Sequence, residues 1–423
     1  MRKNGFKSLL LFVIGILFGI SFCMCIIYIN NVDVDVFKND VQRTNNNFVA
    51  MMVETDVNSK KYVQSSSNEW LTDGYVFNST LSGCENGGVI SWDDVNKKIV
   101  MESNFSDKCY VYFDVYVAPA IPLSEYVLSM YSGEQVNNGL YYHNISLTNG
   151  AGDNSYRYAG ANPNNYVCFG SDESICPNNN LYRIIGIFDG RVKLIKADYA
   201  TIDLLGIDGD YKATYSYSTT TYKGSLSSSD IGVYMWNYNN NTTINNGYGS
   251  NTWSTSLLNK INLNTNYLKN IGSKWAEMIN VTTWKVGGNT YANVFNQVPS
   301  VAYQNEIVNP VITNSTDNAT EYSAKISLMY ASDYGFASLP SSWSTKLGNY
   351  TGDNNWMYMG LSEWINSRYA DSYMRSFLIS GVGFIHFDYV STAIAVRPVF
   401  FLSPFVKYLS GSGTSSDPIR LVV

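Results

Sequence analysis

An apolar run near the N-terminus constrains this chain more than any other feature. Residues Leu9 to Ile29 read LLLFVIGILFGISFCMCIIYI and contain no charged residue. A helix needs roughly 20 such residues to span a bilayer, whereas the apolar core of a cleaved signal peptide has about 7 to 15 and ends at a small-x-small site. Because this run is longer and ends in Cys-Ile-Ile-Tyr-Ile, it predicts an uncleaved transmembrane signal anchor over residues 9–29.

The charges beside this run predict its orientation. Arg2, Lys3 and Lys7 precede it, and no acidic residue lies among the first eight positions. Basic residues flank the cytoplasmic end of a spanning helix. We therefore expect a cytoplasmic tail over residues 1–8, a polar stalk over residues 30–45, and the rest of the chain outside the cell, as in a single-pass protein of the cell membrane.

A different interpretation of the same end is a filament subunit. Gly5-Phe6 before an apolar helix resembles the processing junction of type IV prepilins. Lys7 and Leu10, however, stand where that family has Thr and Glu. A pseudopilin-like subunit is therefore the structural alternative to an anchored surface protein.

Charge and aromatic content narrow the classes of partner. Beyond the anchor the chain has 25 basic and 34 acidic residues, a net charge of −9 against −6 for all 423 residues. Such an excess of acidic residues repels phosphate backbones, so no nucleic acid is expected as a partner. Aromatic residues make up 15% of the chain, as do charged ones, which excludes a disordered chain and is typical of secreted binding modules with Tyr-rich surfaces.

The first part of the exterior predicts a small all-β module over residues 46–118. Side chains alternate with period two, and Asn, Asp, Gly and Ser separate the runs. The expected strands are Gly74 to Phe77, Gly88 to Trp92, Lys98 to Met101 and Cys109 to Val117. Prolines at 119 and 122 then break the pattern, which predicts a linker over residues 119–123.

Residues 124–423 predict a larger α+β domain. A short helix is expected over 123–131, and Asp189-Gly190 predicts a tight hairpin between strands at 181–188 and 191–195. Apolar residues spaced three to four apart predict two further helices within 253–279. The remaining expected strands are 324–330, 376–389 and 393–402, with an edge strand at 418–421.

Four cysteines lie outside the anchor. Cys84 and Cys109 bracket part of the small module, and Cys168 and Cys176 bracket a short loop of the larger domain. Disulfides are the economical interpretation for an even set in an extracellular chain. Zinc binding and free thiols are the alternatives. Neither pair has zinc-ligand spacing, so no metal or cofactor is expected.

No motif of a known catalytic site occurs in the chain. There is no G-x-S-x-G, HExxH, P-loop, G-x-G-x-x-G after a strand, or EF-hand loop. His143 and His386 are the only histidines, and the apolar neighbours of His386 predict a packed strand residue. A glycosidase needs only two carboxylates, so Glu306, Asp333 and Glu363 are the candidates for a glycan-acting hydrolase, the enzymatic alternative.

Aromatic residues in an Asn-, Ser- and Gly-rich region are the candidates for ligand binding. They are Trp343, Trp356, Tyr358 and Trp364. Exposed rings stack on sugar faces while neighbouring amides bind the hydroxyls, although most tryptophans fill cores. We expect at least one of these rings to be exposed for binding a carbohydrate or another surface ligand.

Several segments in order carry a resemblance to a known group. They are NPNNYVCFGS, LYRIIGIFDGRVKLIK, KISLMYASDYGFA, AVRPVFFL and SGSGTSSDPIRL. Over residues 123–423 the chain resembles a large group of uncharacterised, membrane-anchored surface proteins of gut Firmicutes, and SGCENGGVISWD with DKCYVYFD is similar to the module that often precedes that region. The resemblance implies a membrane-anchored cell-surface protein.

The C-terminal region of that group resembles the C-type-lectin-like fold of formylglycine-generating enzymes, through tryptophan-rich strands that end in Arg397-Pro398-Val399. The functional residues do not carry over. No Cys follows Cys176, and the calcium-binding triplets E-P-N, Q-P-D and W-N-D of lectins do not occur. The resemblance thus implies a fold and a location, and the expected role is adhesion or ligand binding without catalysis.

Overall fold

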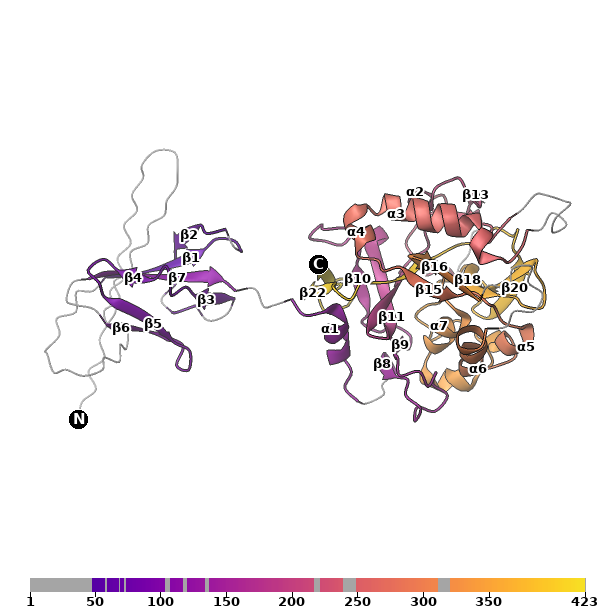
Figure 1. Ribbon diagram of the computed structural model, residues 1–423, viewed down its shortest axis with the longest axis horizontal. Coiled ribbons are helices and arrows are strands. Elements are labelled where there is room, and N and C mark those ends of the chain that lie inside the picture. Colours follow the sequence, from indigo (N-terminus) through magenta and orange to yellow (C-terminus); the bar gives the residue numbers. More distant parts are fainter. Residues whose placement is uncertain are drawn as a thin grey trace. The chain divides into compact units, whose positions relative to one another are not determined.

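The structure is a computed structural model that describes residues 48–57, 59–67, 69–71, 74–102, 107–116, 120–133, 137–216, 221–238, 249–310 and 320–422. The chain divides into two compact units, residues 1–119 and 120–423, and the division falls inside the predicted linker (Figure 1). The predicted tail, anchor and stalk, and the prepilin-like junction, lie outside the described residues. Within the described part of the chain, every helix is too short or too polar to cross a bilayer.

The smaller unit is all-β. Its strands are β1 (Phe48–Glu54), β2 (Tyr62–Gln64), β3 (Tyr75–Phe77), β4 (Gly83–Cys84), β5 (Val89–Asp93), β6 (Lys98–Glu102) and β7 (Lys108–Val115). One sheet has the order β2-β1-β7-β3 with β4 also on β7, and β5 and β6 form a separate hairpin. The alternation along β7 buries Cys109, Val111 and Phe113, which places the core of this unit beneath that strand. The predicted strands appear as β3, β5, β6 and β7.

The larger unit is α+β and is built on a seven-stranded sheet of order β17-β21-β12-β11-β9-β8, with β10 on β11. Its strands are β8 (Gly139–Tyr142), β9 (Tyr156–Ala159), β10 (Tyr166–Cys168), β11 (Leu181–Phe188), β12 (Arg191–Lys196), β17 (Ile326–Ser327) and β21 (Val399–Phe401). Smaller sheets are formed by β13 (Tyr211–Thr214), β14 (Gly232–Tyr234), β15 (Thr282–Lys285), β16 (Glu321–Ala324), β18 (Glu363–Arg368), β19 (Arg375–Ile379), β20 (Ile385–Tyr389), β22 (Lys407–Ser410) and β23 (Arg420–Val422).

Short helices pack around these sheets and against one another. They are α1 (Leu123–Ser129), η1 (Asn178–Asn180), α2 (Ile202–Leu205), η3 (Trp253–Thr255), η4 (Leu258–Tyr267), α3 (Leu268–Asn270), α4 (Ser273–Glu277), α5 (Tyr291–Val294), α6 (Pro299–Tyr303), η5 (Gln304–Val308), α7 (Ala331–Phe336), η6 (Pro340–Ser344) and η7 (Leu347–Asn349). Figure 1 shows α2, α3 and α4 along one side of the unit, and α5, α6 and α7 on the other.

The predicted hairpin is confirmed as β11 and β12, the centre of the large sheet. Asp189 and Gly190 both have positive φ, 48° and 73°, the backbone that a two-residue turn of type I′ requires. Strand β12 is buried along nearly its whole length, because β11 and β21 flank it and helices cover its face. Any charged side chain on this strand must therefore find a partner inside the protein.

The helical segment after residue 253 differs from the predicted pair of α-helices. Its longest part, η4, is a π-helix, and α3 and α4 are short. The side-chain amide of Asn264 donates to the carbonyl oxygen of Asn259 five residues earlier, and that of Asn262 donates to Leu205. The side chains of these asparagines compete with backbone N–H groups for backbone carbonyls, and the spacing of apolar residues does not reveal this competition.

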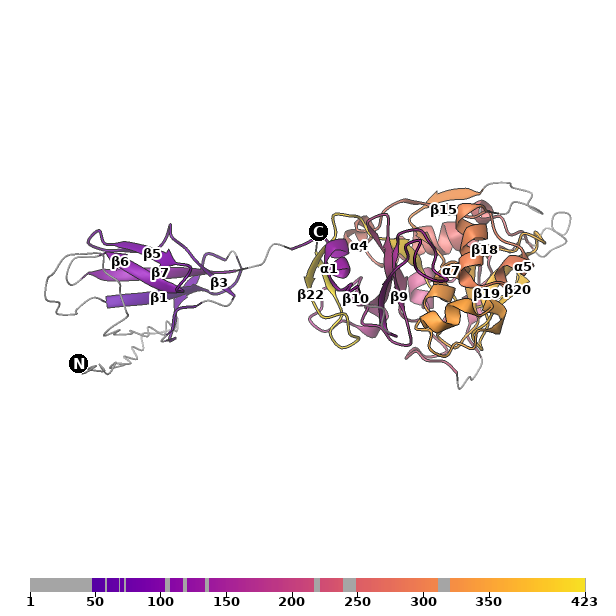
Figure 2. The same cartoon turned by 90° about the horizontal axis from the view of Figure 1, so that it is seen from below.

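The beginning and the end of the larger unit lie side by side. The backbone N–H of Leu123, in α1, donates to the carbonyl of Val406 at 2.9 Å, and Tyr126 stacks on Tyr408 at 3.5 Å between ring centroids. Figure 2 shows α1 next to β22. The predicted edge strand at 418–421 appears as β23, which pairs with β22.

Candidate functional site

A charged pocket of about 200 Å³ lies in the larger unit at the turn end of the β11-β12 hairpin. Elements distant in sequence meet there: β9, the hairpin, β15, α6, α7 and β21. The pocket is lined by Asp153, Ser155, Arg157, Phe188, Asp189, Arg191, Lys193, Thr282, Thr283, Trp284, Tyr303, Ile307, Tyr330, Ser332, Asp333 and Phe401. Three carboxylates and three cations are among these residues, so the charges of the lining balance.

Arg157, on β9, is the first of two buried cations in the pocket. Its Nη2 lies 2.5 Å from Asp153 Oδ2, and its Nε donates to Ser155 Oγ at 2.8 Å. The guanidinium lies over the rings of Phe188 and Tyr303, at 4.6 and 5.2 Å from their centroids. Burial would raise the pKa of Asp153, but the charge of Arg157 and hydrogen bonds from Ser155 lower that pKa to about 2.

Lys193, on β12, is the second buried cation. Its Nζ lies 2.5 Å from Asp333 Oδ2, and both side chains are almost fully buried, 3% and 2% exposed. Asp333 occupies the first turn of α7, where its Oδ2 also accepts from the backbone N–H of Tyr330. Four rings surround the ammonium group at 4.9 to 5.7 Å, those of Tyr330, Phe188, Phe401 and Trp284.

The pocket retains hydrogen-bonding groups that no described residue satisfies. Arg157 Nη1 lies 3.7 Å from Asp333 Oδ1, too far for a hydrogen bond, and neither atom has another such partner among the described residues. Lys193 Nζ hydrogen-bonds only Asp333 within the same set. A ligand that both donates and accepts hydrogen bonds therefore fits these atoms.

Glu306 lies behind the pocket and does not line it. Its Oε1 accepts from the backbone N–H of Ser332 at 2.8 Å, and its Oε2 accepts a short hydrogen bond of 2.5 Å from Ser367 Oγ. Burial raises the pKa of Glu306 to about 7, despite these hydrogen bonds. Of the three predicted acids, Glu306 and Asp333 are thus neighbours, but only Asp333 reaches the pocket.

Glu363, the third predicted acid, belongs to a different cluster. Its two oxygens accept from Arg397 Nε and Nη2 at 2.7 and 2.8 Å, and both side chains are buried. Glu363 is on β18, and Arg397 precedes β21. The structure therefore does not gather the three predicted acids into one cleft, because Arg397 holds Glu363 in the core.

The four aromatic candidates for ligand binding are all buried, so the expectation that at least one is exposed is wrong. Trp343, Trp356, Tyr358 and Trp364 are 1%, 3%, 6% and 0% exposed. Each polar ring atom donates to a backbone carbonyl, those of Phe336, Tyr158, Gly381 and Tyr234, respectively. The Asn- and Ser-rich sequence around these rings suggested a surface, but the rings fill the space between short strands and satisfy their own polar groups there.

One of the two histidines, His386, also differs from the expectation. His386 is on β20 but is exposed and stacks on Phe387, so the prediction of a packed residue is wrong. His143 is the buried one: its Nδ1 accepts from the backbone N–H of Ala151, and its Nε2 has no partner among the described residues. Burial, together with the charge of Arg157, lowers its pKa well below the usual range, so the ring is neutral.

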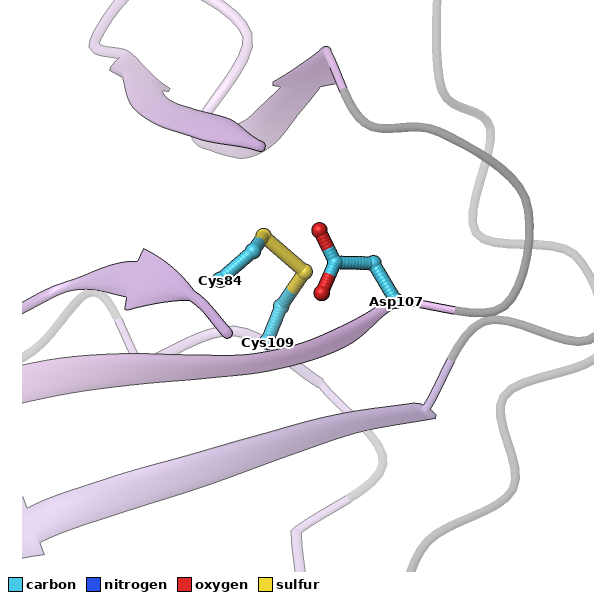
Figure 3. Close-up of side chains that lie close together, drawn as sticks. All are labelled: Cys84, Asp107 and Cys109. Atoms are coloured by element: carbon cyan, nitrogen blue, oxygen red, sulfur yellow. A yellow bond between two sulfur atoms is a disulfide. The ribbon is translucent and has the colours of Figure 1, made fainter. Parts of the chain in front are cut away.

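Both predicted disulfides are present, Cys84–Cys109 and Cys168–Cys176. The first joins residues directly opposite each other on β4 and β7. Asp107 lies beside it, with ligand atoms of all three residues within 4.8 Å (Figure 3). A disulfide offers no thiolate to a metal, and the Asp107 carboxylate accepts from the backbone of Asn86 and Gly88, so this group fits a structural role.

Arg157, Lys193 and Asp153 were not among the residues predicted from the sequence. A signal for Lys193 does exist, since it interrupts the apolar strand VKLI in the hairpin predicted from Asp189-Gly190. A charge inside a buried strand implies an internal partner. The identity of that partner, 140 residues away, is visible only in the fold.

No protein-family model, no curated protein and no solved structure matches this chain.

Proposed function

We propose that the protein is a membrane-anchored bacterial cell-surface protein whose larger unit binds a small uncharged polar ligand, a carbohydrate residue, in the charged pocket. The anchor predicted from the sequence of residues 9–29 and the excess of acidic residues after it support the location. Within the larger unit, the C-type-lectin-like assignment is supported by Arg397-Pro398, which leads into β21 of the central sheet.

The observation that carries the proposal is the pairing of Arg157 Nη1 with Asp333 Oδ1 across 3.7 Å. One group donates and the other accepts, and a hydroxyl group does both, so a sugar hydroxyl satisfies the two atoms together. The balanced charges of the lining favour an uncharged ligand over an anion or a cation. The half-buried rings of Phe188 and Tyr303 supply apolar faces at the same site.

The paired carboxylates favour binding over hydrolysis. A glycosidase needs one carboxyl held protonated as the general acid. In the pocket, Asp153 has a lowered pKa and Asp333 is paired with Lys193. Glu306, whose pKa is raised, does not line the pocket.

The test is a glycan array followed by calorimetric titration, with the full chain in detergent micelles. We expect binding of a small set of neutral glycans, and at least a tenfold weaker affinity in Tyr303→Ala and in Asp153→Asn, because one loses a ring face and the other releases Arg157. Lys274→Ala, on the exposed surface, is the matched control and should bind as the wild type does. Silence across the array, or binding that both pocket variants retain, would contradict the proposal.

A further inference from the structure

Lys193 and Asp333 combine a very short contact with nearly complete burial. Their Nζ and Oδ2 atoms are 2.5 Å apart at 3% and 2% exposure. A second Lys–Asp pair in the same unit, Lys274 and Asp172, has the same 2.5 Å separation but is 55% and 65% exposed. The described residues of the larger unit thus include one Lys–Asp pair that water solvates and one that it does not, with the same reacting groups.

Burial changes the chemistry available to the first pair. Charges removed from water are costly, and the aromatic rings around Lys193 Nζ replace much of its hydration. Burial accordingly lowers the pKa of Lys193, although Asp333 opposes that change. Transfer of one proton from the ammonium to the carboxylate gives a neutral amine beside a carboxylic acid, which are the two reactants of amide formation.

The groups around Asp333 are placed to assist such a reaction. A nitrogen 2.5 Å from a carboxyl oxygen is also close to the carbon that carries this oxygen, and such proximity favours an intramolecular reaction. Arg157 Nη1, 3.7 Å from Oδ1, is a cation on the side where negative charge would develop.

We propose that Lys193 and Asp333 form an intramolecular isopeptide bond. The lone pair of neutral Nζ attacks Asp333 Cγ, and a C–N bond forms. One proton passes from the nitrogen to the departing hydroxyl. The C–O bond then breaks and one water leaves through the adjoining pocket. Nothing is oxidised or reduced, and no further reactant is needed.

The bond would join β12 to α7, two elements 140 residues apart in sequence. It removes one positive and one negative charge, so the charges of the pocket lining still balance. The amide oxygen also remains as an acceptor opposite Arg157. The cross-link is therefore compatible with ligand binding in the same pocket, and a test of the cross-link does not depend on whether the pocket binds a ligand.

Mass spectrometry of the full chain tests the proposal directly. After reduction of the disulfides, the intact mass should be lower than the sequence mass by one water molecule. A tryptic digest should contain residues 192–196 joined to residues 326–346, because trypsin does not cleave after an acylated lysine. Lys274, in the exposed pair, is the internal control and should be cleaved normally. The full sequence mass together with cleavage after Lys193 would overturn the proposal.

Two variants test which residues take part in the cross-link. Lys193→Arg keeps the positive charge without the amine nucleophile and should restore the missing water mass; a water loss that persists would overturn the assignment to Lys193. Glu306→Gln is the buried control: it keeps an acceptor for Ser332, touches neither reacting group and should remain linked.

Discussion

The larger unit contains two buried acid–base pairs that differ in how completely they are bonded. Arg397 binds Glu363 through two hydrogen bonds and gives a third to the carbonyl of Met357. Lys193 has one hydrogen-bond partner, Asp333, among the described residues, and Arg157 stands 3.7 Å from the other oxygen of that carboxylate. The Glu363–Arg397 pair satisfies both carboxylate oxygens within the core, whereas the Lys193–Asp333 pair lines a pocket.

The difference follows from the chemistry of the two cations. A guanidinium stays protonated and matches both oxygens of a carboxylate, so the Glu363–Arg397 pair is suited to holding strands together. An ammonium is a single point charge whose pKa falls readily on burial. A buried lysine can therefore lose its proton and react or bind, whereas an arginine that holds both oxygens of a carboxylate stays charged and paired.

The largest effect is expected from Arg397→Met. Removing the guanidinium leaves Glu363 as an uncompensated charge in the core, which costs about 3 to 5 kcal/mol of the free energy of unfolding. Burial already raises the pKa of Glu363, so the loss should shrink at acidic pH, where this carboxyl takes up a proton. Urea unfolding followed by tryptophan fluorescence measures it, because seven of the nine tryptophans lie in this unit.

The control for this variant removes both charges. Arg397→Met combined with Glu363→Leu should recover most of the lost stability, because no charge then remains unpaired. If Arg397→Met alone lowered the free energy of unfolding by less than about 1 kcal/mol, that would contradict a structural role for the Glu363–Arg397 pair.

Glu306→Gln should change how stability depends on pH. The pKa of Glu306 is about 7 in the folded protein and 4.5 as the ordinary value. The folded state therefore retains a proton that the unfolded state releases, and the free energy of unfolding should fall as the pH rises from 4.5 to 7. The span corresponds to about 3 kcal/mol. Glu306→Gln should remove this slope, and equal slopes in both proteins would contradict a buried, protonated Glu306.

The same contrast explains what the sequence could predict. Alternation and Asp189-Gly190 were sufficient for the β11-β12 hairpin and for β7, because local spacing determines them. Asp333 was recognised as a candidate, but its partner Lys193 was not, because this contact joins segments 140 residues apart. The candidate rings failed for a related reason: an Asn-rich neighbourhood does not reveal that Trp364 donates its N–H to Tyr234 inside the core.

Asp153→Asn should give the opposite pH dependence, with a smaller effect. The charge of Arg157 lowers the pKa of Asp153 from 3.8 to about 2, against the effect of burial. Its contribution is thus present above pH 3.8 and lost as the pH falls toward 2, which amounts to about 2 kcal/mol. The variant should lose this amount at neutral pH and nothing at the acid end. Unfolding curves over this range would contradict the assignment if the two proteins differed equally at both ends.

The smallest effect is expected from Lys274→Ala, in the exposed counterpart of the Lys193–Asp333 pair. Both pairs have N···O separations of 2.5 Å, so distance alone would assign them equal strength. Water screens the exposed pair, however, and its loss should cost no more than about 1 kcal/mol and should disappear in high salt. Urea unfolding at low and high ionic strength measures this. A larger, salt-independent loss would mean that contact distance, not burial, determines the strength of these pairs, and the contrast between the two regions would fail.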